Sequence, residues 1–135
     1  MKGKISQVIG PVVDVEFSET LPKIYHALEI KLSDKEKLVL ETQQHLGGNK
    51  VRAVAMGSTD GLKRGMEVIS TGNAIEVPVG PQTLGRMFNL LGQPIDGKEM
   101  FKPDKVRAIH RDAPRFEDQS VKQEIFETGI KVIDL

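Results

Sequence analysis

Apolar and polar residues alternate one by one along much of the first 80 positions, the period of strands with one buried face. Val13, Val15 and Phe17, for example, alternate with Asp14 and Glu16. The same period recurs in runs near residues 28–32, 38–41, 51–55, 66–69 and 74–77. Gly, Pro, Asn and Asp punctuate these runs as turns. Short strands at this spacing predict a small barrel or sandwich, and closing such a sheet removes its exposed edges.

The pattern changes after Pro78 and Pro81, where a helical period replaces the alternation. Apolar residues stand at the i, i+3, i+4 and i+7 positions expected of one helix face: Leu84, Met87, Phe88 and Leu91. Thr83 suits an N-cap and Gly92 a C-terminal stop. We therefore predict a short helix over residues 83–92.

Prolines dominate the next segment. Pro94, Pro103 and Pro114 exclude long helices and predict a long irregular stretch. Residues 123–128 then suit a strand, and residues 129–135 suit the start of a helix with Ile130 and Ile133 on its apolar face. Because a helix of about two turns is marginal alone, we expect the sequence to be part of a longer chain.

Composition narrows the function classes. The 135 residues include 19 basic and 19 acidic side chains, balanced on both sides of Gln82, so no positive field gathers nucleic acid or anionic lipid. The absence of Cys excludes disulfides and thiolate metal sites. No apolar run approaches the ~18 residues of a membrane helix, and the first residues lack the core of a signal peptide.

Two segments come close to the phosphate-loop pattern of Gly, four residues, Gly-Lys and a hydroxyl residue. In residues 92–99, Glu99 stands where the hydroxyl would hold magnesium and Pro94 removes one amide donor. In residues 80–87, Arg86 and Met87 replace the lysine and the hydroxyl residue. Both segments are interpreted as loop or helix-start sequences without phosphate chemistry.

Other candidates for chemistry are equally isolated. His26, His45 and His110 have no metal-ligand spacing and are predicted to be surface or loop residues. Four carboxylates are predicted to be ordinary solvated groups: Asp14, Glu16, Glu117 and Asp118. A local basic cluster suits a solvated loop or a subunit contact: Lys102, Lys105, Arg107, Arg111 and Arg115. We predict no catalytic, cofactor-binding or metal-binding residue in this chain.

Several motifs together resemble the beta (catalytic) subunit of the rotary ATP synthases, over essentially the whole chain. They are GKI at 3–5, VIGPVVDVEF at 8–17, LPKIY at 21–25, VPVG at 77–80, TLGRMFNLLGQPID at 83–96 (except Met87), IHR at 109–111, AP at 113–114, EI at 124–125 and ETGIKVIDL at 127–135. The most specific is QQHLGGNKVRAVAMGSTDGL at 43–62, where the related alpha subunit has a different sequence.

The resemblance implies a mainly β fold. Residues 1–80 are expected to form the crown domain, a small six-stranded Greek-key barrel. Residues 81–135 are expected to begin the α/β nucleotide-binding domain, with a short helix and a long loop, and to stop before its phosphate loop.

The resemblance also implies a function. In the family, three beta subunits alternate with three alpha subunits around a central rotor stalk, and the barrels join into a ring. The parent subunit binds Mg-ATP or Mg-ADP and couples their interconversion to proton or sodium flow. It sits at the cytoplasmic face of the energy-transducing membrane and meets the membrane only through the ion-translocating sector. This chain lacks the phosphate loop, so we expect it to serve hexamer assembly and to be inactive alone.

Two alternatives remain open. The chain could be a free-standing crown module without catalysis. It could also be an oligonucleotide-binding barrel, since small Greek-key barrels serve that role. The second alternative requires a basic groove and stacking aromatics, whereas the barrel segment offers only Phe17 and Tyr25.

Overall fold

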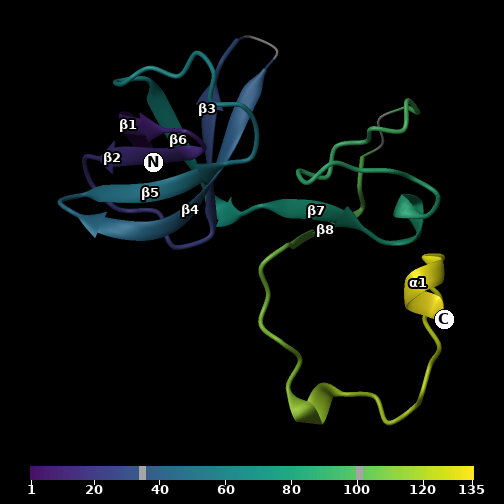
Figure 1. Cartoon of the computed structure of the whole chain (residues 1–135). Coiled ribbons are helices and arrows are strands. Elements are labelled where there is room, and N and C mark those ends of the chain that lie inside the picture. Colours follow the sequence, from purple (N-terminus) through teal and green to yellow (C-terminus); the bar gives the residue numbers. More distant parts are fainter. Residues whose placement is uncertain (34–35, 100–101) are drawn as a thin grey trace.

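The computed structural model describes residues 1–33, 36–99 and 102–135. Figure 1 shows a β-barrel at the N-terminal end, a two-stranded ribbon leading away from it, and a long irregular segment that ends in a short helix. The strands are β1 (Lys2–Ile9), β2 (Val12–Phe17), β3 (His26–Lys31), β4 (Lys37–Gly47), β5 (Lys50–Ala55), β6 (Glu67–Ala74), β7 (Glu76–Val79) and β8 (Lys105–Ala108).

The first six strands close into a barrel in the order β1-β2-β5-β4-β3-β6, with β6 returning to pair with β1. All of the pairings are antiparallel. The connections from β2 to β3 and from β5 to β6 join strands that are not neighbours, whereas hairpins join β1 to β2, β3 to β4 and β4 to β5. The predicted mainly β fold with a six-stranded barrel is confirmed.

The core of the barrel consists mainly of residues that the alternation placed on one face, together with Ile5 of β1, which lies outside the predicted runs. They are Ile5, Val13, Val15, Phe17, Leu28, Ile30, Leu38, Leu40, Val51, Ala53 and Val68. On β2, Glu16 is exposed, as the alternation requires. The register explains the packing, because Val15 stands opposite Ile5 on one side and Val51 on the other.

Asp14 departs from the expected pattern. It was predicted to be a solvated carboxylate, but it is buried on β2. Arg52, directly opposite on β5, donates to both carboxylate oxygens, from Nε to Oδ1 at 2.8 Å and from Nη2 to Oδ2 at 2.9 Å. The prediction for Asp14 is wrong because the Arg52 guanidinium supplies the hydrogen bonds that water would give to a solvated carboxylate. The pairing of β2 with β5 places Arg52 opposite Asp14.

Beyond the barrel, β7 and β8 form an antiparallel ribbon in which Val77 stands opposite Arg107 and Val79 opposite Lys105. The predicted strand over residues 74–77 spans two elements, since β6 ends at Ala74 and β7 begins at Glu76. The alternation did not predict β8, which is only Lys105–Ala108.

The predicted helix over residues 83–92 is wrong. A 3-10 turn, η1 (Pro81–Thr83), ends at the first residue of this range, and turns and an isolated bridge between Phe88 and Pro94 follow. Gly85 has a φ of +68°, outside the helical region. The Asn89 side chain accepts hydrogen bonds from the Leu91 and Gln93 N–H groups at 3.0 and 2.9 Å. Local side-chain bonds of this kind compete with helix formation.

The C-terminal segment is mostly irregular. It contains a second 3-10 turn, η2 (Phe116–Asp118), and one helical turn, α1 (Lys131–Asp134). The predicted strand over residues 123–128 does not form, and the predicted helix start is limited to α1. Within the described parts of the chain, no helix is long and apolar enough to cross a membrane.

Candidate functional site

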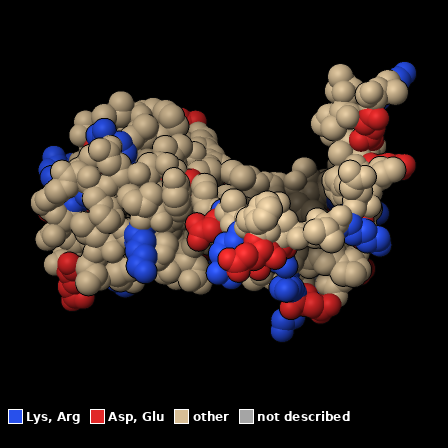
Figure 2. Space-filling model, turned by 90° about the horizontal axis from the view of Figure 1, so that it is seen from below, with Lys and Arg blue, Asp and Glu red and all other residues tan. Residues whose placement is uncertain are grey.

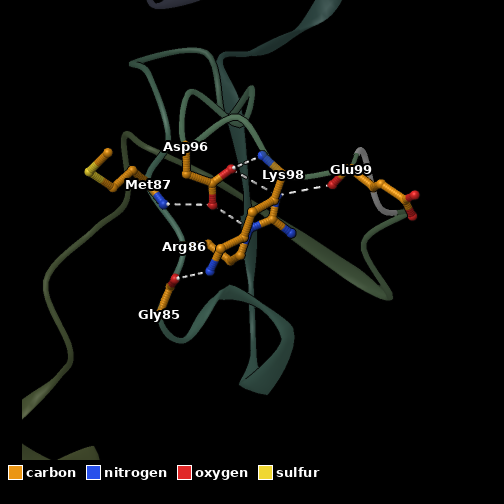
Figure 3. Close-up of polar contacts among 6 residues, drawn as sticks. All are labelled: Gly85, Arg86, Met87, Asp96, Lys98 and Glu99. Carbon is orange, nitrogen blue, oxygen red and sulfur yellow. Dashed lines mark hydrogen bonds and ion pairs between the residues drawn. The ribbon is translucent and has the colours of Figure 1, made fainter.

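A cluster of polar contacts outside the barrel closes the loop between Gly85 and Glu99 (Figure 3). Arg86 donates to the Asp96 carboxylate through Nε and through Nη2, the latter at 3.1 Å, and Nη2 also donates to the Glu99 carbonyl at 3.0 Å. The Lys98 N–H donates to Asp96 Oδ1 at 3.1 Å, and Lys98 Nζ donates to the Gly85 carbonyl at 3.3 Å. Both ends of the loop are therefore tied to one ion pair.

This ion pair is largely shielded from water. The Arg86 and Asp96 side chains are only 14% and 7% exposed. The hydrogen bond from Arg86 holds the pKa of Asp96 well below its usual range, and the amides of Lys98 and Met87 act in the same direction. The carboxylate in turn raises the pKa of Arg86. Asp96 therefore stays ionised, and its function in this geometry is to fix the loop.

The loop includes residues 92–99, the nearer of the two matches to a phosphate loop. Its Lys98 amide and ammonium both donate to groups of the same loop. Among the described residues, the first element after it is strand β8 (Lys105–Ala108) and not a helix, whereas a phosphate cradle uses the N-terminus of a helix that follows directly. The geometry of this segment is that of a structural loop.

We expect this loop to open as pH falls. The depressed pKa of Asp96 means that its contribution to stability is complete above the ordinary aspartate pKa, ~3.9, and is lost as pH falls toward the folded-state value. Amide exchange at Met87 and Lys98, followed from pH 6 to pH 2.5, should show faster local opening at the acidic end. The measurement corrects for intrinsic exchange chemistry.

The variant Asp96→Asn should already show fast opening at pH 6 and little further change with acid. Asp112→Asn, at an exposed position, is the matched control and should behave like the parent chain. The same acid response in Asp96→Asn and the parent would exclude Asp96 as the titrating group.

A shallow groove of about 530 Å³ lies between this loop and the barrel, lined in part by Val39, Thr71 and Leu91. Two of the charged residues that line it, Glu29 and Lys37, pair with each other at 2.8 Å. The groove shows that Leu91 and Gln93 lie against barrel strands.

Each of the three histidines has a different environment. His26 is half-buried on β3, His45 Nε2 lies 2.7 Å from the Pro22 carbonyl, and His110 lies beside Glu41. Among the residues that the structure describes, no group of His, Asp and Glu could hold a metal ion. Glu117 and Asp118 are exposed, and the basic residues of the predicted cluster are exposed as well.

The features expected of an oligonucleotide-binding barrel are not brought together. Phe17 is buried in the core, and the Tyr25 ring is stacked on His110. Figure 2 shows acidic and basic side chains intermixed beyond the barrel, with only scattered charges over the barrel on that face. A basic groove with stacking aromatics is not formed there.

Sequence reasoning missed both the Arg86–Asp96 pair and the Glu41–His110 pair. For the first pair the sequence offered only a weak signal, opposite charges ten positions apart at either end of a segment that contains Asn89, Gly92 and Pro94. No local signal existed for the second pair, whose members are separated by 69 positions.

Comparison with known proteins identifies the barrel. Residues 5–72 match the family described as the ATP synthase alpha/beta family, beta-barrel domain. The match covers the strands that close the barrel, from within β1 into β6. The chain belongs to the ATP synthase alpha/beta family. Membership of this family implies assembly with ATP synthase subunits.

Proposed function

We propose that this chain is the N-terminal part of an ATP synthase beta subunit and that it serves assembly of the alpha/beta ring. The observation that carries the proposal is the closed barrel at the residues matched to the family. The choice of beta over alpha rests on residues 43–62, which run from β4 through β5 and resemble the beta sequence.

The segment beyond the barrel supports an assembly function. Large apolar side chains remain exposed along it: Leu84, Met87, Leu90, Ile95, Phe116, Val121, Ile125, Phe126, Val132 and Leu135. Exposed apolar surface on this scale marks contacts with other protein. Under this proposal these side chains pack against further parts of the catalytic subunit and its neighbours.

The activity of the assembled enzyme follows from the same proposal. The beta subunit interconverts ATP with ADP and phosphate on Mg-nucleotide, coupled to proton or sodium flow, at the cytoplasmic face of an energy-transducing membrane. The 135 residues contain no complete phosphate-loop motif. Their contribution is therefore to hold the subunit beside its alpha partners, around the rotor stalk, and not to bind nucleotide.

The test is binding to isolated ATP synthase subunits. We expect the chain to form a stable complex with alpha subunits in size-exclusion chromatography and to compete with full-length beta for them. Isolated beta subunits serve as the matched partner control. Equal binding to alpha and beta would contradict the assignment as beta, and binding to neither would contradict the assembly function.

A second measurement tests the nucleotide part of the proposal. Calorimetry with Mg-ATP should give no saturable heat in the micromolar range for this chain. A full-length beta subunit in the same buffer is the positive control. Micromolar saturable binding by the 135-residue chain would overturn this part.

A further inference from the structure

A buried carboxylate on the barrel is paired with a histidine from beyond the ribbon. The Glu41 side chain, on β4, is only 7% exposed. Gln43 Nε2 donates to its Oε1 at 2.6 Å, and His110 Nε2 lies 2.8 Å from its Oε2. Because an uncompensated buried charge is strongly destabilising, this carboxylate requires its partners.

Glu41 is one wall of a site around the His110 ring, and Tyr25 is the second wall. Its ring is stacked on the His110 ring, with centroids 4.1 Å apart and planes 18° from parallel. Tyr25 has a φ of +69°, a left-handed conformation that is unusual for an aromatic residue. Its N–H donates to the Thr42 carbonyl at 2.7 Å, which fixes this backbone next to Glu41. Strained residues that the surroundings hold in place are typical of functional sites.

The two walls together select a particular kind of group. An aromatic face favours a flat or cationic partner, and a buried carboxylate favours a cationic hydrogen-bond donor. A protonated imidazole ring meets both requirements, because its face can stack on the aromatic ring while an N–H at its edge donates to the carboxylate. Among the described residues, Tyr25 stacks on the His110 ring and Glu41 lies within hydrogen-bond distance of it.

We propose that Tyr25 and Glu41 form a binding site for a planar cationic ring, which His110 fills and thereby latches the segment after β8 onto the barrel. The adjacent backbone supports this assignment. The Ile109 N–H donates to the Ile75 carbonyl at 2.9 Å, which extends the β7–β8 ribbon up to the latch. His110 thus fixes the direction in which the chain leaves the barrel.

The first test uses the Ile109 amide as a reporter in the full chain. In His110→Ala, its hydrogen exchange should accelerate by at least about tenfold, because removal of the ring leaves the Glu41 carboxylate without one of its partners and favours local opening. Glu41→Gln should give a similar acceleration, and the double variant should add little to either change. His45→Ala is the matched control, because its ring contacts the Pro22 carbonyl and no carboxylate; it should leave the Ile109 amide unchanged.

The second test fills the vacated site from solution. Free imidazole at pH 6 should raise the Tm of His110→Ala in a saturable way, since a ligand that binds only the folded state stabilises it. It should not raise the Tm of the His110→Ala/Glu41→Gln double variant or of His45→Ala. An equal response in the single and double variants would overturn the proposal, as would an unchanged exchange rate at Ile109 in His110→Ala.

If His110→Ala does not fold, two substitutions of Tyr25 provide the test instead. Tyr25→Phe keeps the ring and should exchange at Ile109 like the parent chain. Tyr25→Gly removes the ring while favouring the positive φ, and should accelerate exchange several-fold. Equal rates in these two variants would overturn the stacking half of the site.

Discussion

Replacement of Val15 by Asp is expected to unfold the barrel. Val15 is fully buried, and its cross-strand partners Ile5 and Val51 are buried as well. The new carboxylate would point into this apolar interior, opposite to the face on which Arg52 binds Asp14. An unpaired buried charge destabilises by roughly 3–5 kcal/mol, which approaches the ~5–15 kcal/mol total stability of a typical domain. Thermal and urea unfolding followed by circular dichroism would measure the loss.

Glu16→Asp is the matched control for that experiment. The neighbouring side chain points outward, is 57% exposed and lies 3.8 Å from Lys50, so its stability should change by less than about 0.5 kcal/mol. Near-normal stability of Val15→Asp would mean that the strand register is wrong.

Replacement of Gly92 by Ala is expected to detach the loop of residues 85–99 from the ribbon. A Cβ at this position would lie 2.5 Å from Pro78 Cδ and 3.2 Å from Val77 Cα, and Gly92 has a φ of +72°. The proline ring cannot rotate away as a flexible side chain would. Strain at the positive φ and overpacking together should cost roughly 2–4 kcal/mol. Amide exchange at Asn89 and Gln93, whose bonds close this turn, would report the local opening.

Gly97→Ala separates the two contributions. Gly97 has a nearly equal φ of +71°, but a Cβ there meets no atom within 4 Å. It should therefore show only the backbone strain, about 1 kcal/mol. If the two alanine variants open the loop equally, contact with Pro78 does not hold the loop against β7.

The strands of the barrel could be predicted because their signal is local. On β2 and β5, every second residue enters the same interior, so Val13, Val15, Val51 and Ala53 show the alternation directly. The signal weakens in β1, where Gly3 supplies no apolar side chain to the interior and a register shift between Ile5 and Gln7 interrupts the period. Pairing with β2 and β6 on either side, and not its own alternation, accounts for this strand.

The helix predicted over residues 83–92 shows where periodicity misleads. Leu84, Met87 and Leu91 have the correct spacing, but Gly85 and Asn89 change the direction of the chain within that window. Apolar spacing carries no information on such backbone turns, and Leu84 and Met87 in fact remain exposed. Turn chemistry outweighs the helical period here.

The polar clusters could be predicted least. Asp14 and Glu41 occupy strands in which a carboxylate normally faces water, and each is buried because a partner from a distant part of the sequence reaches it. Such partners become visible only when the topology is known. The Arg86–Asp96 pair lies closer in sequence, ten positions apart, but opposite charges at that distance are too common to identify a pair.

Closure of the barrel between its first and last strands has a consequence for synthesis of the chain. β1 cannot complete its pairing until Val68 and Ile69 of β6 have been made, and β3 waits for the same strand. At roughly 5–20 residues per second, the edges of β1 and β3 stay open on the ribosome for a time on the order of seconds. Contacts this distant in sequence also slow folding, and open edges attract other strands. The nascent chain is therefore most vulnerable to aggregation just before β6 emerges, and the protein depends on reaching that strand before it meets another copy.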